Sequence, residues 1–277
     1  MFEIVLTLSN LYLLLFMIST AIIAGFLAGL FGIGGGLIMV PFLFYIFNYL
    51  EVNPDYLMHL AVGTSFAIII PTSIVSVYTH FKLNGVDIDL VKSYGIFSVF
   101  GVISGTVFAT FLTTKPLMLF FACVIFFFSS YLLFFKQNEE KILLSIKIKY
   151  KIIFGFISGF ISAPMGIAGG IMNVPVFKFF GYQINKAIGT AAAIGFFISL
   201  FGAVSFLISG SYLDVNLKFS YGFINIPAFL IFIPITTLMA RVGAKTVHRI
   251  DKNKISKYFG LFLLIVGIKF IYQYISF

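Results

Sequence analysis

Two glycine-rich segments carry the strongest chemical signal in this sequence. Gly32-Ile-Gly-Gly-Gly-Leu-Ile-Met-Val-Pro41 recurs as Gly166-Ile-Ala-Gly-Gly-Ile-Met-Asn-Val-Pro175, so that Gly32 corresponds to Gly166 and Pro41 to Pro175. Glycine gives the backbone conformations that other residues avoid, and a helix that begins after such a turn presents unpaired N–H groups and the positive end of its dipole. Such a helix end can bind an anion without a buried arginine. Close packing through small residues is the alternative for one copy, but two copies with equal spacing favour an anion site.

The candidate substrate site takes its first residues from these segments. In each copy a proline follows the last glycine by five residues, and it makes either a functional bend near the site or a tolerated kink. Asn173 stands where the first copy has Met39, and a buried amide needs a partner, either the substrate or a neighbouring helix. The segments contribute these predicted substrate-binding residues: Gly32, Gly34, Gly35, Gly36, Pro41, Gly166, Gly169, Gly170, Asn173 and Pro175.

Hydroxyl side chains form a second candidate feature, on the segment 57–80. Ser65, Thr72, Ser76 and His80 share one helical face, which predicts either a polar path for substrate or hydroxyls that bond back to their own helix. His80 borders a turn and is expected to be a loop or interfacial histidine. The remaining predicted substrate-binding residues are Thr64, Ser65, Thr72, Ser76, Thr190 and Asn225, of which Asn225 is expected within the apolar run 219–240.

Arg241 ends that apolar run and begins a basic loop. It either anchors the topology of the chain or steers anions electrostatically toward the cytoplasmic side of the site.

Composition identifies the elements that must position these residues. Hydrophobic residues make up 61% of the 277 positions and charged residues 10%, which excludes a soluble globular domain and intrinsic disorder. The apolar runs are longer than β-barrel strands and do not alternate in polarity, so they predict helices. The net charge of +9 is assigned to cytoplasmic loops rather than to nucleic-acid binding. The expected segments are 9–31, 36–49, 57–80, 90–112, 116–135, 152–165, 169–181, 187–209, 219–240 and 255–276.

The segments form two membrane repeats, 1–135 and 152–277, joined by a basic linker at 136–151. The runs 36–49 and 169–181 are too short to cross a hydrocarbon core of about 30 Å, so they are expected to be half-helices that begin at membrane depth. Five segments in each half make the repeats inverted, whereas breaks within single spanning helices would leave four. We therefore predict an all-α polytopic membrane protein of about 8–10 segments, with two inverted repeats that each contain a half-helix.

Basic residues predict the orientation of the chain in the membrane. The linker 136–151 and the loop 241–257 carry most of the lysines and arginines, and five segments per half place both on the same side. The positive-inside rule makes that side the cytoplasm and puts both termini outside it, in a multi-pass protein of the cell membrane.

Other kinds of chemistry find less support. No Asp or Glu lies well inside an expected segment, which argues against a cation pump and against an intramembrane carboxylate enzyme. No His, Cys and carboxylate residues have the spacing of metal ligands, and we expect neither a metal nor another cofactor. Cys123 is the only cysteine and is expected to be buried in the apolar run Phe120–Phe128.

The run from Gly25 to Pro41 resembles the first signature of the sulfite exporter TauE/SafE family. Further support comes from Ala61-Val-Gly-Thr-Ser65, His80-Phe-Lys-Leu-Asn-Gly85, the second glycine-rich copy and Tyr221-Gly-Phe-Ile-Asn-Ile-Pro227. The resemblance implies a multi-pass permease for small anions, often sulfur oxyanions or organosulfonates. The second signature has Ala168 where a glycine is usual, with Pro164 before it, which argues against two equivalent sites.

The leading functional hypothesis is therefore a secondary transporter, not an enzyme. It would move sulfite, a sulfonate or a related sulfur or organic acid anion by alternating access, driven by a gradient of substrate, protons or another ion. A membrane scaffold or a subunit of a larger complex is the alternative, and an integral-membrane enzyme is a weaker one. The expected partners are the small anion, a coupling proton or other ion, and the lipid bilayer.

Overall fold

The computed structural model describes residues 8–32, 34–134, 146–213, 217–246 and 252–276. Residues 136–145 of the predicted linker and 247–251 of the predicted basic loop lie outside the described residues. The first half contains α1 (Leu8–Phe31), α2 (Gly36–Tyr49), a 3-10 turn (Pro54–Tyr56), α3 (Leu57–Lys82), α4 (Ile88–Thr110) and α5 (Thr114–Phe134). The second half contains α6 (Ile148–Met165), α7 (Gly170–Phe179), α8 (Ile184–Tyr212), β1 (Ser220–Tyr221), β2 (Ile224–Asn225), α9 (Ile226–Thr246) and α10 (Lys252–Ser276).

The prediction of an all-α polytopic membrane protein is confirmed. Within the described ranges, seven helices are long and apolar enough to cross a membrane, namely α1, α3, α4, α5, α8, α9 and α10. The two short helices occur where they were expected: α2 has 14 residues and α7 has 10, and each follows a glycine-rich break. The order of the described helices, with five in each half, also agrees with the predicted segments.

The start of the predicted run 219–240 is wrong. α9 begins only at Ile226, because the preceding residues form a short antiparallel hairpin in which Ser220 pairs with Asn225 and Tyr221 with Ile224. Gly222 has a φ of +52°, which a turn can use and a helix cannot. Asn225 therefore lies at the end of a helix instead of within it, and its Oδ1 accepts a hydrogen bond of 3.0 Å from the Ala228 N–H.

Two further expectations need correction. Cys123 is exposed on α5, on a face that other side chains of the protein do not cover, and is not buried. His80 was expected to be a loop or interfacial residue, and it is not in a loop: it is buried in the last turn of α3, where its Nε2 lies 3.2 Å from the carbonyl oxygen of Gly29 on α1. Packing against α1 buries this end of α3, and the hydropathy of the sequence does not indicate that contact.

The helices pack in matching pairs drawn from both halves. α1 lies along α9, and its counterpart α6 lies along α4; α3 packs against α8, and α5 against α10. Glycines bring the backbones close in corresponding places. A Cβ on Gly25 would lie 2.6 Å from the Thr236 carbonyl oxygen, and one on Gly159 would collide with the carbonyl oxygen of Ser98. Each half therefore completes the packing of the other.

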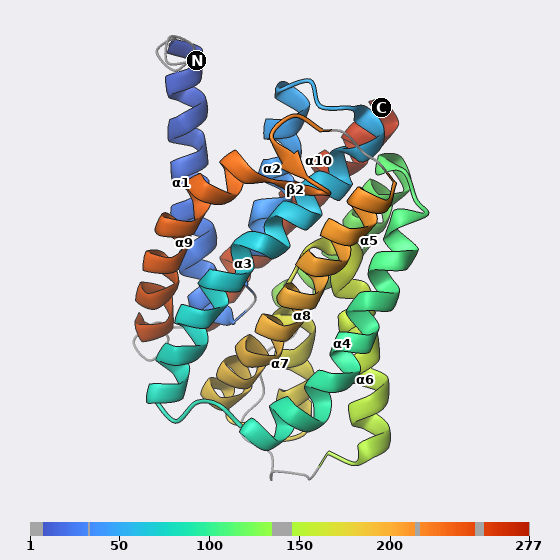
Figure 1. Ribbon diagram of the computed structural model, residues 1–277. Coiled ribbons are helices and arrows are strands. Elements are labelled where there is room, and N and C mark those ends of the chain that lie inside the picture. The colour runs from blue at the N-terminus through green and yellow to red at the C-terminus, as the bar shows by residue number, and fades with distance from the viewer. Residues whose placement is uncertain (1–7, 33, 135–145, 214–216, 247–251, 277) are drawn as a thin grey trace.

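Corresponding helices of the two halves run in different directions. Figure 1 shows α3 and α8 in the middle of the bundle with opposite chain directions, and it shows α1 beginning at the end of the bundle where α10 finishes. Inverted repeats require this arrangement. The inversion itself, and the side of the membrane on which each end lies, stay predictions.

Candidate functional site

The two glycine-rich breaks meet inside the bundle. Gly35 precedes α2 with a φ of +78°, and Gly169 precedes α7 with a φ of +70°, so both short helices begin after a left-handed residue that favours glycine. A Cβ on Gly36 would collide with the carbonyl oxygen of Gly166, and one on Gly34 would lie 2.6 Å from the Cβ of Ala168. The breaks of the two halves are therefore in direct backbone contact, and both short helices begin near this point.

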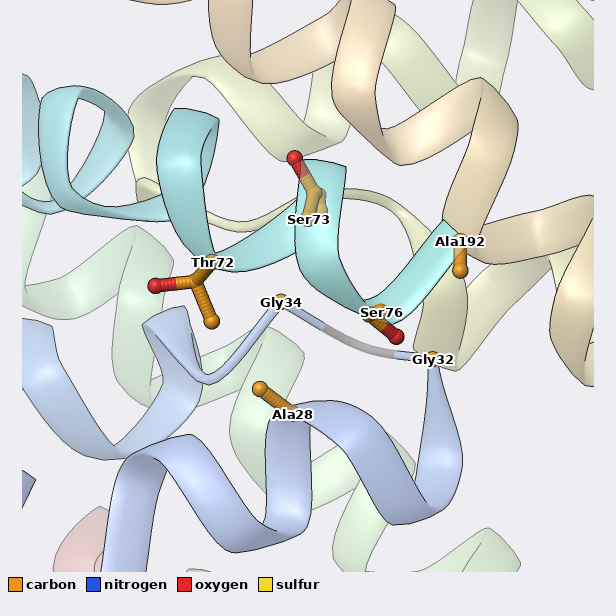
Figure 2. Close-up of a pocket in the computed structure, with 8 residues that line it drawn as sticks. Ala28, Gly32, Gly34, Thr72, Ser73, Ser76 and Ala192 are labelled. Carbon is orange, nitrogen blue, oxygen red and sulfur yellow. The ribbon is translucent and has the colours of Figure 1, made fainter. Parts of the chain in front are cut away.

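A small cavity lies beside this contact. Its volume is about 10 Å³, roughly the room that one water molecule needs. A sulfite-sized anion does not fit, so passage of such an anion would require the surrounding elements to move apart. The lining residues come from both halves and are shown in Figure 2: Ala28, Gly32, Gly34, Thr72, Ser73, Ser76, Ala168 and Ala192.

The α3 hydroxyls behave differently from one another at this cavity. The Thr72 hydroxyl lies 2.9 Å from both the Ile68 carbonyl oxygen and the Thr236 Oγ1, and Figure 2 shows it pointing away from Gly34. Ser76 points its hydroxyl toward Gly32, and this buried Oγ has no hydrogen-bond partner within the described structure. Thr72 thus bonds to its own helix and to Thr236, whereas the Ser76 hydroxyl is unpartnered, and the polar path along the stripe stays a prediction.

Ser65 does not line the cavity but contacts the glycine-rich break beside it. Its hydroxyl donates a hydrogen bond of 2.9 Å to the carbonyl oxygen of Gly166. This bond ties α3 of the first half to the glycine-rich break of the second half. Ser65 therefore holds α3 against the second break.

Thr64, Thr190 and Asn225 lie at the two ends of the bundle and hold loops. The Thr64 Oγ1 accepts a 2.9 Å hydrogen bond from the Asn225 N–H, and the Thr190 Oγ1 accepts one of the same length from the Asp87 N–H. None of the three is among the residues that line the cavity.

The other predicted site residues surround the breaks or lie outside them. Gly170 is the first residue of α7, and Pro41 and Pro175 lie within the short helices. Asn173 is buried, and its Oδ1 accepts a 2.8 Å hydrogen bond from the hydroxyl of Tyr94 on α4. Arg241 is exposed near the end of α9.

A charged cluster at one end of the bundle was missed by sequence reasoning. The Oδ2 of Asp87 accepts a 3.2 Å hydrogen bond from the Tyr182 hydroxyl and lies 3.9 Å from the Lys186 Nζ, while Oδ1 caps α4 at the Leu90 N–H. Burial, followed by the Asp87 carboxylate, raises the pKa of Tyr182 to about 12. Tyr182 therefore stays a hydrogen-bond donor at neutral pH.

Sequence reasoning also missed Ala28, Ser73, Ala168 and Ala192, which line the cavity. Alanine carries no chemical signal, and a position beside a cavity depends on long-range packing. One available signal was not used: comparison of the repeats residue by residue shows where one half replaces alanine by serine.

Comparison with known proteins identifies a family and several relatives of this chain. The family model described as "Sulfite exporter TauE/SafE" matches residues 17–270. A protein of Haemophilus influenzae named "Probable membrane transporter protein" is 32% identical over 89% of this chain and 93% of its own length. Probable membrane transporter proteins of Methanocaldococcus jannaschii and Bacillus subtilis are 29% and 24% identical, over 93% and 91% of this chain and 95% of their own lengths in each case. No solved structure gives a significant match.

Proposed function

The chain belongs to the sulfite exporter TauE/SafE family, and from this premise we propose that it is a secondary permease for a small anion. The anion is sulfite, a sulfonate or a related sulfur or organic acid anion, and it crosses the cell membrane by alternating access. The observation that carries the proposal is the contact between the two glycine-rich breaks, each of which opens a short helix inside the bundle. A scaffold protein would have no need for two such breaks.

The energetics of this arrangement suit a transporter. An anion at a helix N-terminus gains about 0.3–2 kcal/mol from the dipole. Each charge-assisted hydrogen bond adds roughly 1.5–3 kcal/mol. Three or four contacts, after losses on association, give about 4–8 kcal/mol, which corresponds to micromolar or millimolar binding. None of the residues that line the cavity is Lys or Arg, so the anion can leave without breaking a buried ion pair.

Flux measurements test the proposal. Purified protein in proteoliposomes should exchange labelled anion in a counterflow screen of sulfite, thiosulfate, sulfoacetate, taurine and simple carboxylates. Arg241→Gln should lower only the rate, and more strongly at low ionic strength, because an exposed charge steers anions without binding them. Folded protein that moves none of these anions, in either direction and with or without a pH gradient, would support the scaffold alternative.

The proposed orientation puts the linker 136–151 and the loop 241–257 in the cytoplasm and both termini outside. Single cysteines at positions 138 and 253 should then be labelled from the same side by a membrane-impermeant thiol reagent. Cys123 is exposed, so the measurement needs a Cys123→Ala background. Labelling from opposite sides would contradict the inverted-repeat arrangement.

A further inference from the structure

We infer that the anion binds off centre, at the N-terminus of α7, and that the matching end of α2 is not a binding site. The ligands are the hydroxyls of Ser158 and Ser162, the amide Nδ2 of Asn173 and the free N–H groups of the first turn of α7. This inference rests on the proposed function and specifies which of the two breaks performs the binding.

Unpartnered polar atoms concentrate at this point. Ser158 is 1% exposed, and Ser162 and Asn173 are fully buried. Across the part of the chain that the structure describes, five buried side-chain polar atoms have no hydrogen-bond partner, and Ser158 Oγ, Ser162 Oγ and Asn173 Nδ2 are three of them. A buried polar group without a partner costs about 1–3 kcal/mol, so three in one place indicate a ligand that would satisfy them.

The two serine hydroxyls lie against the start of α7, the helix that carries Asn173. A Cβ on Gly169, the residue before this helix, would lie 2.9 Å from Ser158 Oγ and 3.1 Å from Ser162 Oγ. The Gly169 carbonyl oxygen already accepts the N–H groups of Met172 and Asn173. The N–H groups of the two preceding residues have no partner within the helix, as is usual for the first turn of a helix.

Tyr94 orients the amide of Asn173. Its hydroxyl donates to Asn173 Oδ1 at 2.8 Å, which leaves the NH₂ group of the amide as the free end. The same hydroxyl lies near Ser158, although no hydrogen bond of good geometry joins them. Tyr94 is therefore a positioning residue that holds a donor toward the site.

The α2 end has the same kind of backbone N–H groups but lacks all three of these side-chain donors. When Gly166 is aligned with Gly32, Ser158, Ser162 and Asn173 correspond to Ala24, Ala28 and Met39. Around Gly35, a Cβ would lie 2.8 Å from the carbonyl oxygen of Ala24 and 3.3 Å from the Cβ of Ala28. A backbone oxygen and methyl groups thus face the start of α2, and neither donates a hydrogen bond to an anion.

The chemistry of the α7 site defines its ligand. Hydroxyl, amide and backbone N–H groups supply hydrogen-bond donors, and none of the three side chains is charged. A small anion with several oxygen acceptors fits such a set of donors. Sulfite and the sulfonate group of an organosulfonate are anions of this kind. The two serine hydroxyls of α6 already lie close to Gly169, so binding requires α6 and α7 to separate to make room for the anion.

Calorimetric titration of purified protein with sulfite, thiosulfate and methanesulfonate tests the site. Two double variants give the α7 site the residues of the α2 end: Ser158→Ala with Ser162→Ala, and Asn173→Met with Tyr94→Phe. In the second variant Tyr94 is replaced by Phe because Phe232 is its counterpart in the other half. Phe232 follows Asn225 at the same spacing at which Tyr94 follows Asp87. Each should weaken binding about tenfold or more, as expected for the loss of one or two hydrogen bonds to a charge. Ser158→Ala with Ser162→Ala should not lower the Tm of the free protein, because it removes only unpartnered hydroxyls.

The matched control is the reverse change at the α2 end, Ala24→Ser or Met39→Asn, which should alter affinity less than about threefold. Unchanged affinity in both double variants of the α7 site, together with binding by the wild-type protein, would overturn the α7 site and leave the proposed function intact. Wild-type protein that binds none of the three anions would overturn both.

Discussion

The loops that precede α4 and α9 share a backbone design and differ in charge. Asp87 comes directly before α4 and Asn225 directly before α9, at corresponding places in the two halves. Each side chain caps the helix that follows, through Oδ1 to an N–H three residues on, and each backbone N–H donates to a threonine, Thr190 or Thr64. Asp87 contacts the Tyr182 hydroxyl and Lys186, whereas the Asn225 amide, among the described residues, contacts only a serine hydroxyl at 3.2 Å beyond its cap.

The features that the two halves share determine the fold, and the features that differ supply chemical groups. Caps, threonine contacts and glycine contacts recur in both halves, because they determine how helices start and how closely they pack. Within the described ranges, the charged cluster at Asp87 and the unpartnered polar groups near the start of α7 have no counterpart at the matching places. The two halves therefore share their helix starts and close contacts but place different side chains around them.

The largest expected effect comes from breaking the contact between the halves. Gly36→Ala forces a methyl group into the carbonyl oxygen of Gly166, and backbone on both sides limits relaxation. We expect a loss of about 3 kcal/mol of folding free energy. Gly95→Ala is the control, since its Cβ would meet only the Cγ1 of Ile194 at 3.9 Å and the change should gain about 0.5–1 kcal/mol. Thermal unfolding in detergent compares the two, and an equal Tm would show that the breaks are not tightly packed.

Exchange of the two caps should have unequal effects. Asn225 is only 8% exposed, and no cation contacts its side chain in the described part of the chain. Asn225→Asp would keep the cap but bury a charge, at a cost of about 1–3 kcal/mol. Denaturant or thermal unfolding measures this cost. No change in stability would mean that this end of the bundle is wetter than its burial indicates.

The reciprocal change, Asp87→Asn, should cost less than about 1 kcal/mol, because asparagine caps a helix as well as aspartate does. The lost ion pair is also a long and partly exposed one, with Lys186 45% exposed. The same unfolding measurement applies. A loss as large as that of Asn225→Asp would show that the charge of Asp87 is essential to the fold.

The smallest effect concerns the titration of Tyr182. In the wild-type protein its pKa is raised to about 12, so the stability that its protonated form contributes is present below about pH 10 and is lost as the pH rises toward 12. Asp87→Asn should lower this pKa, while burial, the larger cause, keeps it above the ordinary value of about 10. Tyrosine-labelled NMR, assigned with Tyr182→Phe, measures the change, and a pKa that stays the same would contradict the contact with Asp87.

Hydropathy and the repeat predicted most of the fold. The bounds of α2 agree with the expected run 36–49, because glycines mark its start and polar residues its end. The helix predicted for residues 219–225 was wrong because the same apolar residues suit a hairpin and a helix, and Gly222 alone indicates the turn. The prediction that Cys123 is buried was wrong because an apolar run does not show which face packs against protein and which faces lipid.

The cavity residues were predictable where a glycine motif or the hydroxyl stripe of α3 marked them. Gly32 and Gly34 line the cavity, as the glycine spacing suggested, and so do Thr72 and Ser76 of the stripe. Ala28 and Ala192 could not be found, because their place depends on contacts between distant helices. Ser158 and Ser162 were visible in principle, since they replace the alanines of the first half, but their lack of partners is a property of the packed structure.

The pairing of α1 with α9 affects the order in which the protein can assemble. α1 is made first, yet the helix that covers its glycine face begins only at Ile226, near the end of the chain. α4 receives its partner α6 much earlier, from Ile148 onward. During synthesis the α4–α6 pair can therefore form while the small-residue face of α1 still contacts lipid, so ribosomes stalled before α9 should carry an α1 that crosslinks to lipid.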